Sequence, residues 1–199
     1  MYKKYIAEGV GTFGLSFAVV LAVLVGSTSI PVPIIAGLTL GLFVYTIGPI
    51  SGSHINPAVT LAQLAVRKIS SRDAGIYIIA QFIGAGLALA VANSLGATAT
   101  MISTGGDSGR VFFAEVIGSF FFNFGIAGVV YGKTKEQMSG IVVGGSLVLG
   151  IIIASISGSL GILNPAVALA LDAFSPLYIV APIVGAVLGF LTYKYVAGE

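Results

Sequence analysis

The sequence contains no cysteine and a single histidine, and only 8% of its 199 residues are charged. The absence of cysteine excludes disulfides, thiolate-bound metals and thiol chemistry, and one histidine without cysteine does not make a metal site. A net charge of +2 is too small to suggest a nucleic-acid partner. No nucleophile–base pair or phosphate-binding loop is visible, so we expect no enzymatic activity, no catalytic residue and no cofactor.

Apolar sequence fills the chain instead. Hydrophobic residues make up 57%, 28 residues are glycine, and the mean hydropathy is +1.07. Soluble domains carry roughly 25% charged residues, so a soluble protein is excluded. The charges are clustered and leave long stretches without any: Gly9–Val66, Ala74–Gly106, Val116–Gly132, Gln137–Leu171 and Ala173–Tyr193. These stretches lack the alternating polarity of membrane β-strands, so we expect an all-α membrane protein.

Turn and charge signals divide the chain into six candidate transmembrane helices. They are Tyr5–Gly26, Pro33–Gly48, Arg72–Gly96, Val111–Tyr131, Met138–Ser157 and Pro176–Ala197. With the N-terminus in the cytoplasm, eight of the nine basic residues fall inside and only Arg110 falls outside, which is a strong positive-inside bias. We therefore expect a multi-pass protein of the cell (plasma or inner) membrane with both termini cytoplasmic.

Two motifs recur at a nearly constant distance. Ala7-Glu8-x-x-Gly11-Thr12-Phe13 is echoed by Ala114-Glu115-x-x-Gly118-Ser119-Phe120, 107 residues later, and Asn56-Pro57-Ala58-Val59 by Asn164-Pro165-Ala166-Val167, 108 residues later. Residues 1–199 are thus expected to form one transmembrane channel domain of two repeats, about 1–106 and 107–199. Each repeat has three spans, so the second enters from the opposite face, as in inverted repeats that enclose substrate sites near the midplane.

Each Asn-Pro-Ala motif predicts the start of a short helix, because Asn is a preferred N-cap and Pro a preferred first helical residue. The apolar runs that follow, Ala58–Val66 and Ala166–Phe174, are about half as long as a bilayer is thick. We expect two re-entrant half-helices that meet at the midplane. Non-helical backbone at that depth must line a cavity or be buried, so the preceding loops supply candidate pore-lining carbonyls: Gly52, Ser53, His54, Ile55, Gly161, Ile162 and Leu163.

Two converging helix N-termini determine the chemistry of this centre. Each carries roughly half a positive charge, and each Asn amide can donate a hydrogen bond. The centre therefore repels cations, including protons, and offers donors to a neutral solute. We expect it to be formed by Asn56, Pro57, Ala58, Asn164, Pro165 and Ala166.

These motifs resemble those of the aquaporin or major intrinsic protein family over essentially the whole chain. The resemblance rests on Ala7–Phe13, on Ser51–Thr60, on the second Asn-Pro-Ala and on Ala181–Ala186. It implies a homotetramer of independently conducting bundles, surrounded by membrane lipid, that passively passes water or small uncharged solutes. It also implies that Glu8 and Glu115 hydrogen-bond the re-entrant loops and hold the half-helices.

The chain departs from the family pattern at the filter outside the Asn-Pro-Ala centre. Val167 stands where water-selective members have an arginine, and spacing from the motifs places the other filter positions at Ala36, Ile152 and Gly161. A filter without a fixed charge predicts a wider pore for larger or less polar neutral solutes, although an apolar ring can also gate by dewetting. Glycerol-type members keep the arginine and add an aspartate, and Asp172 lies too far along to be that residue.

The sequence leaves two other functions open. Inverted repeats and broken helices also occur in ion-coupled secondary transporters, although the interior lacks acidic residues beyond Glu8 and Glu115. A non-conducting membrane scaffold is the second alternative. Glu8 could also form an interfacial pair with Lys4 or relay protons instead of holding a loop. The His54 ring could sense pH rather than pack against its neighbours.

Overall fold

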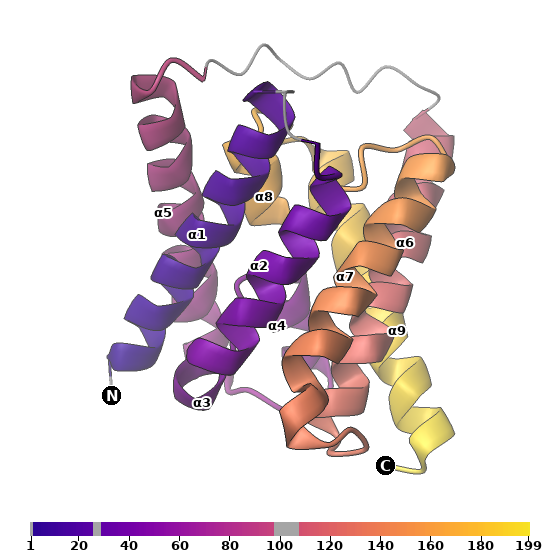
Figure 1. Ribbon diagram of the computed structural model, residues 1–199. Coiled ribbons are helices and arrows are strands. Elements are labelled where there is room, and N and C mark those ends of the chain that lie inside the picture. Colours follow the sequence, from indigo (N-terminus) through magenta and orange to yellow (C-terminus); the bar gives the residue numbers. More distant parts are fainter. Residues whose placement is uncertain (1, 26–28, 98–107) are drawn as a thin grey trace.

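The computed structural model describes residues 2–25, 29–97 and 108–199, which form a bundle of helices (Figure 1). The helices are α1 (Lys3–Val25), α2 (Val32–Thr46), α3 (Gly48–Ser51), α4 (Pro57–Ala65), α5 (Ser71–Ser94), α6 (Ser108–Val130), the 3-10 turn η1 (Glu136–Met138), α7 (Ser139–Ile156), α8 (Pro165–Ala170) and α9 (Pro176–Ala197). No strand occurs in this part of the chain. The boundary expected between the repeats, at residues 106–107, lies outside the described residues.

Among the described residues, five helical segments are long and apolar enough to cross a membrane: α1, α5, α6, α9, and α7 together with η1. The sixth span is α2, whose 15 residues extend about 22 Å at 1.5 Å per residue. It packs between α1 and α7. α1 begins and α9 ends at the same end of the bundle (Figure 1), as an even number of crossings requires. The expected all-α membrane fold is confirmed.

A serine caps the N-terminus of two of the spans. The hydroxyl of Ser70 accepts a hydrogen bond from the backbone N–H of Asp73 at the start of α5 (3.1 Å). Ser175 does the same for Tyr178 at the start of α9 (3.5 Å). Such caps satisfy N–H groups that have no partner within the helix, which matters most where a helix begins at a membrane surface.

Glycines allow the transmembrane helices to cross at close range. At the α2–α7 crossing, a Cβ added to Gly144 would lie 2.3 Å from the carbonyl oxygen of Gly37. At the α1–α5 crossing, a Cβ on Gly84 would lie 2.3 Å from the carbonyl oxygen of Gly9, and α6 and α9 meet in the same way at Gly185. In lipid, where no hydrophobic effect drives helix association, such contacts supply the van der Waals packing that holds a bundle together.

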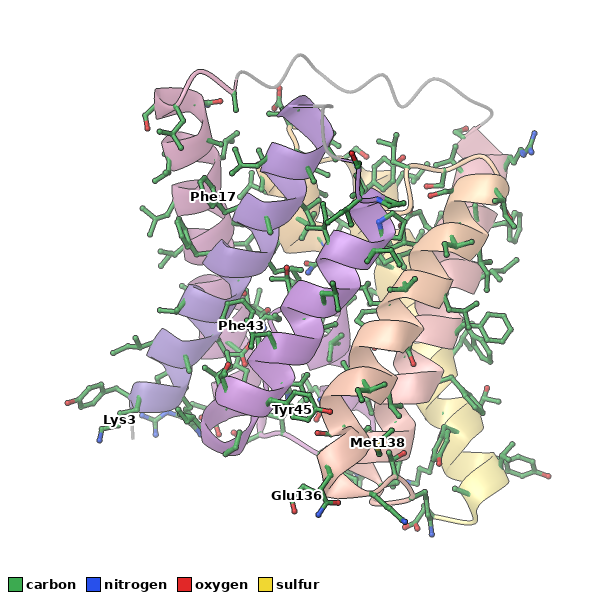
Figure 2. All side chains as sticks on the ribbon, in the orientation of Figure 1. Lys3, Phe17, Phe43, Tyr45, Glu136 and Met138 are labelled. Carbon is green, nitrogen blue, oxygen red and sulfur yellow. The ribbon has the colours of Figure 1, made fainter. Side chains whose placement is uncertain are left out.

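Charged side chains join the helices at the end where the termini lie. Lys4 pairs with Asp73 (2.8 Å), and Lys133 with Glu199 (2.8 Å). The hydrogen bond and charge of Lys133 hold the pKa of the Glu199 carboxyl below its ordinary value. Figure 2 shows Lys3 and Glu136 at this same end. These two ion pairs thus mark a polar surface at the end of the bundle where the termini lie.

We expect Gly144→Ala to destabilise the folded protein by about 1–3 kcal/mol, because the new methyl group meets backbone and cannot be accommodated by a rotamer change. The measurement is the thermal unfolding midpoint in detergent. Gly145→Ala is the matched control, since a Cβ there meets nothing within 4 Å. Equal midpoints for the two variants would contradict the close crossing.

Candidate functional site

Two half-helices begin in the middle of the bundle at the Asn-Pro-Ala motifs. The side-chain oxygen of Asn56 accepts a hydrogen bond from the N–H of Ala58 (2.8 Å), and that of Asn164 from the N–H of Ala166 (3.0 Å). Pro57 and Pro165 occupy the first helical positions of α4 and α8. The motifs therefore cap the helices as their sequence predicts. α8 ends at Ala170, earlier than the sequence suggested.

The same two asparagines also bind the loops to each other. The amide nitrogen of Asn56 donates to the carbonyl of Leu163 (3.0 Å), and the amide nitrogen of Asn164 donates to the carbonyl of Ile55 (3.1 Å). These two carbonyls, expected to belong to a pore-lining series, thus serve the contact between loops. Each asparagine amide carries two N–H groups, so each keeps one beyond this contact.

A buried carboxylate holds the first loop from behind. Glu8 is fully buried and accepts hydrogen bonds from the backbone N–H groups of His54 (2.9 Å) and Ile55 (2.7 Å). It also accepts from the hydroxyl of Ser51 (2.7 Å) and the amide of Gln81 (2.8 Å). Because Lys4 pairs with Asp73, the alternative Lys4–Glu8 pair is wrong.

Glu115 holds the second loop in the same way. It accepts from the backbone N–H groups of Ile162 (3.0 Å) and Leu163 (2.8 Å) and from the hydroxyl of Ser159. These loops need such support because Ile55 and Leu163 have φ values of 37° and 53°. That region is strained for residues with a Cβ, above all for a β-branched one, and persists only where the surroundings over-determine it.

Five loop carbonyls accept no hydrogen bond within the described part of the chain: those of Gly52, Ser53, His54, Gly161 and Ile162. The residues that carry them border two cavities. The His54 ring is buried, with Nδ1 3.1 Å from the hydroxyl of Thr60 and its plane edge-on to Tyr77. The ring therefore packs against its neighbours.

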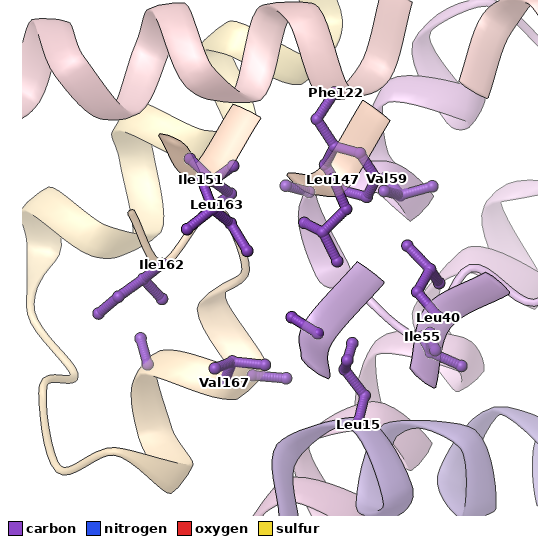
Figure 3. Packing of buried hydrophobic residues seen from close by; sticks show 14 of the residues in the cluster. Leu15, Leu40, Ile55, Val59, Phe122, Leu147, Ile151, Ile162, Leu163 and Val167 are labelled. Atoms are coloured by element: carbon purple, nitrogen blue, oxygen red, sulfur yellow. The ribbon is translucent and has the colours of Figure 1, made fainter. Parts of the chain in front are cut away.

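Two cavities meet at the half-helix junction. We call the one toward the termini the inner cavity (about 50 Å³) and the other the outer cavity (about 60 Å³). Leu40, His54 and Phe122 border both. A single water needs only about 10–15 Å³, so each cavity has room for more than one. Figure 3 shows Leu15, Leu147 and Val167, from three different helices, directed toward a common space.

The two cavities are lined by equivalent residues of the two repeats. Most residues that line the outer cavity have a partner 107 or 108 residues away that lines the inner one. The pairs include Leu15 and Phe122, Val19 and Ile126, Ala36 and Val143, Ile151 and Val44, Gly161 and Ser53, Val167 and Val59, and Leu171 and Gln63. Equivalent residues of the two repeats therefore line the two halves of the pore, and the two halves have opposite orientations.

Three of the four expected filter residues, Ala36, Gly161 and Val167, line the outer cavity. The expectation for Ile152 is wrong. Its side chain is 42% exposed on the outside of the bundle, and Ile151 lines the cavity instead. The side chains of successive residues in an α-helix point about 100° apart around the helix axis. An error of one residue therefore selects a side chain that does not face the pore. The repeat gives the correct register, because Ile151 pairs with the lining residue Val44.

Gln63 was not among the expected pore residues, yet it lines the inner cavity. The signal that indicates it is helical periodicity, since Gln63 lies seven residues, about two turns, after Asn56 and hence on the same face of α4. Among the described residues, no three of His, Cys, Asp or Glu gather as a possible metal site.

Together, the six spans, the opposed half-helices and the paired cavities define a helical membrane channel for neutral solutes. Residues 1–193 match the Major intrinsic protein family. The chain is 34% identical to Aquaporin AqpM of Methanothermobacter marburgensis, with 99% of this chain and 98% of that protein covered. It is 35% identical to Glycerol uptake facilitator protein-like 6 of Lactiplantibacillus plantarum, with 99% of each covered.

The fold also matches the X-ray structure of the aquaglyceroporin from Plasmodium falciparum, with a TM-score of 0.75 at 20% identity over 98% of this chain and 95% of that one. The chain belongs to the major intrinsic protein family. It is a passive channel for water or small uncharged solutes and not an enzyme.

We expect Glu8→Gln to lower the stability of the protein by about 1–3 kcal/mol. The glutamine amide would place an NH₂ where Glu8 now accepts a backbone N–H, which leaves that group unpaired. The thermal midpoint in detergent should fall, and water permeability of reconstituted vesicles should fall with it. Glu136→Gln, at an exposed position, is the control; an equal midpoint for both variants would show that the carboxylate does not hold the loop.

Proposed function

We propose that this channel passes small neutral solutes through a wide, apolar outer constriction formed by Ala36, Ile151, Gly161 and Val167. The observation that supports this is the composition of the outer cavity, where none of the described residues that line it is charged. Its remaining polar side chains, His54, Asn56 and Asn164, lie at the midplane junction. A solute in this half of the pore therefore loses hydration without a charged group to replace it.

Both relatives named above fit this class of solute, since one is called an aquaporin and the other a glycerol uptake facilitator. Ion coupling has less support. Glu8 and Glu115 are fully buried and occupied by the N–H groups of the loops, so neither is presented to a passing cation. The N-termini of α4 and α8 add positive potential at the junction.

The test is stopped-flow light scattering on proteoliposomes with water, glycerol and urea. We expect Val167→Arg to reduce glycerol and urea permeability by more than it reduces water permeability, because the guanidinium narrows the outer cavity and adds a fixed charge. Unchanged ratios would place the constriction elsewhere. Saturable or gradient-coupled uptake by the wild type would contradict a passive channel.

A matched pair of variants tests the register of the constriction. Ile151→Phe should reduce glycerol permeability, since the ring would enter the outer cavity, whereas Ile152→Phe should not, since that side chain points away from the bundle. Equal effects of the two substitutions on permeability would overturn the assignment of Ile151.

We also propose that both termini are cytoplasmic, in the cell (plasma or inner) membrane. The basic residues Lys3, Lys4, Arg67, Lys68, Arg72, Lys133, Lys135 and Lys194 support this under the positive-inside rule. Because the chain has no cysteine, single cysteines report topology cleanly. A membrane-impermeant maleimide should label Arg110→Cys in intact cells and Lys135→Cys only after lysis; the reverse pattern would refute the orientation.

A homotetramer in contact with lipid is the assembly that we propose for the channel. The exposed apolar side chains along the outer faces of the spans support contact with lipid or with further copies of the chain. Light scattering of the detergent-solubilised protein measures its mass, and a monomer there would contradict the tetramer.

A further inference from the structure

The two halves of the pore share one architecture but differ in polarity. In the outer cavity, Gly161 and Leu171 occupy positions whose repeat partners in the inner cavity are Ser53 and Gln63. The repeat relation explains why lining residues occur at these positions. It does not explain why the inner pair alone carries hydrogen-bonding side chains.

The Ser53 side chain is 5% exposed, and its hydroxyl has no hydrogen-bond partner among the described residues. A buried hydroxyl without a partner is costly, and the inner cavity that Ser53 borders offers the space in which a partner can bind. Gln63 lines the same cavity, 7% exposed, and lies beside the His54 ring.

We propose that Ser53 and Gln63 form a polar binding station in the inner cavity for a small uncharged polyol or amide, and that this station sets which neutral solutes the channel passes. This inference rests on the proposed function, because it requires that solutes other than water enter through the outer cavity. A hydroxyl and a carboxamide each offer both a donor and an acceptor. They match solutes whose own groups donate and accept.

Position along the pore gives the station its role in selection. Gln63 lies six residues after Pro57, or about 9 Å along α4 toward the inner end. A solute that has lost its hydration in the apolar outer half first meets the Asn56 and Asn164 amides and then the station. A larger solute has more polar groups to satisfy than water, so it depends more on side-chain partners at this depth.

The experiment compares glycerol, urea and water permeability of Gln63→Leu with wild type in proteoliposomes. Leucine occupies the equivalent position 171 in the outer cavity. A leucine side chain is therefore compatible with a cavity wall of this geometry. We expect glycerol and urea permeability to fall about 3- to 10-fold relative to water, which corresponds to the loss of one hydrogen bond. Gln63→Asn, which keeps the amide, should recover part of the loss.

Ser53→Ala should lower the same ratio, and Ser119→Ala is its matched control. The Ser119 hydroxyl is also buried and without a partner among the described residues, but Ser119 borders neither cavity. An unchanged solute-to-water ratio in Gln63→Leu overturns the station alone, as does an equal effect of Ser53→Ala and Ser119→Ala. A wild-type protein that passes water but neither glycerol nor urea overturns the wide constriction and the station together.

Discussion

A polypeptide that leaves its helix inside a bilayer exposes N–H and C=O groups that lipid cannot satisfy, and the pore of this protein depends on how its two loops meet that constraint. Glu8 and Glu115 each accept the N–H groups of two consecutive loop residues. With these donors satisfied on one side, the loops keep their strained positive-φ geometry. Their remaining carbonyls are left available to the cavities. The role of each buried carboxylate is thus to accept hydrogen bonds from the loop backbone. The solute path needs no acidic group of its own.

Holding each loop is not sufficient, because the two half-helices direct their positive ends at one another and repel. The reciprocal bonds from Asn56 to the Leu163 carbonyl and from Asn164 to the Ile55 carbonyl oppose this repulsion. Each asparagine thereby performs two tasks, capping its own helix and tying it to the opposite loop. This double use explains why the pair must be asparagine. An aspartate could cap the helix but would lack the amide donor.

The parts of this site that could be predicted from sequence are those encoded locally or by the repeat. The Asn-Pro pairs predict the half-helices because capping depends on adjacent residues. The carbonyl contacts of Ile55 and Leu163 depend on the opposite loop, more than 100 residues away, and local patterns carry no information on them. Ile152 was misplaced because spacing was counted through a loop, whereas the repeat aligns Ile151 with Val44 directly. Gln63 was overlooked because one polar residue in a short apolar helix is unremarkable until its face is known.

The absence of an arginine beside the second motif does not by itself make this pore leak ions. An apolar wall offers a cation no replacement for its hydration shell, and moving an unpaired charge into such surroundings costs far more than moving a neutral hydroxyl or amide. In the constriction that we propose, Val167 and Ile151 therefore oppose ions through desolvation, where a fixed charge would act through repulsion. The helix N-termini of α4 and α8 then add a positive potential at the point where hydration is least. In the proposed arrangement, an apolar outer half and polar inner groups together reject charged species while they admit a wider range of neutral solutes.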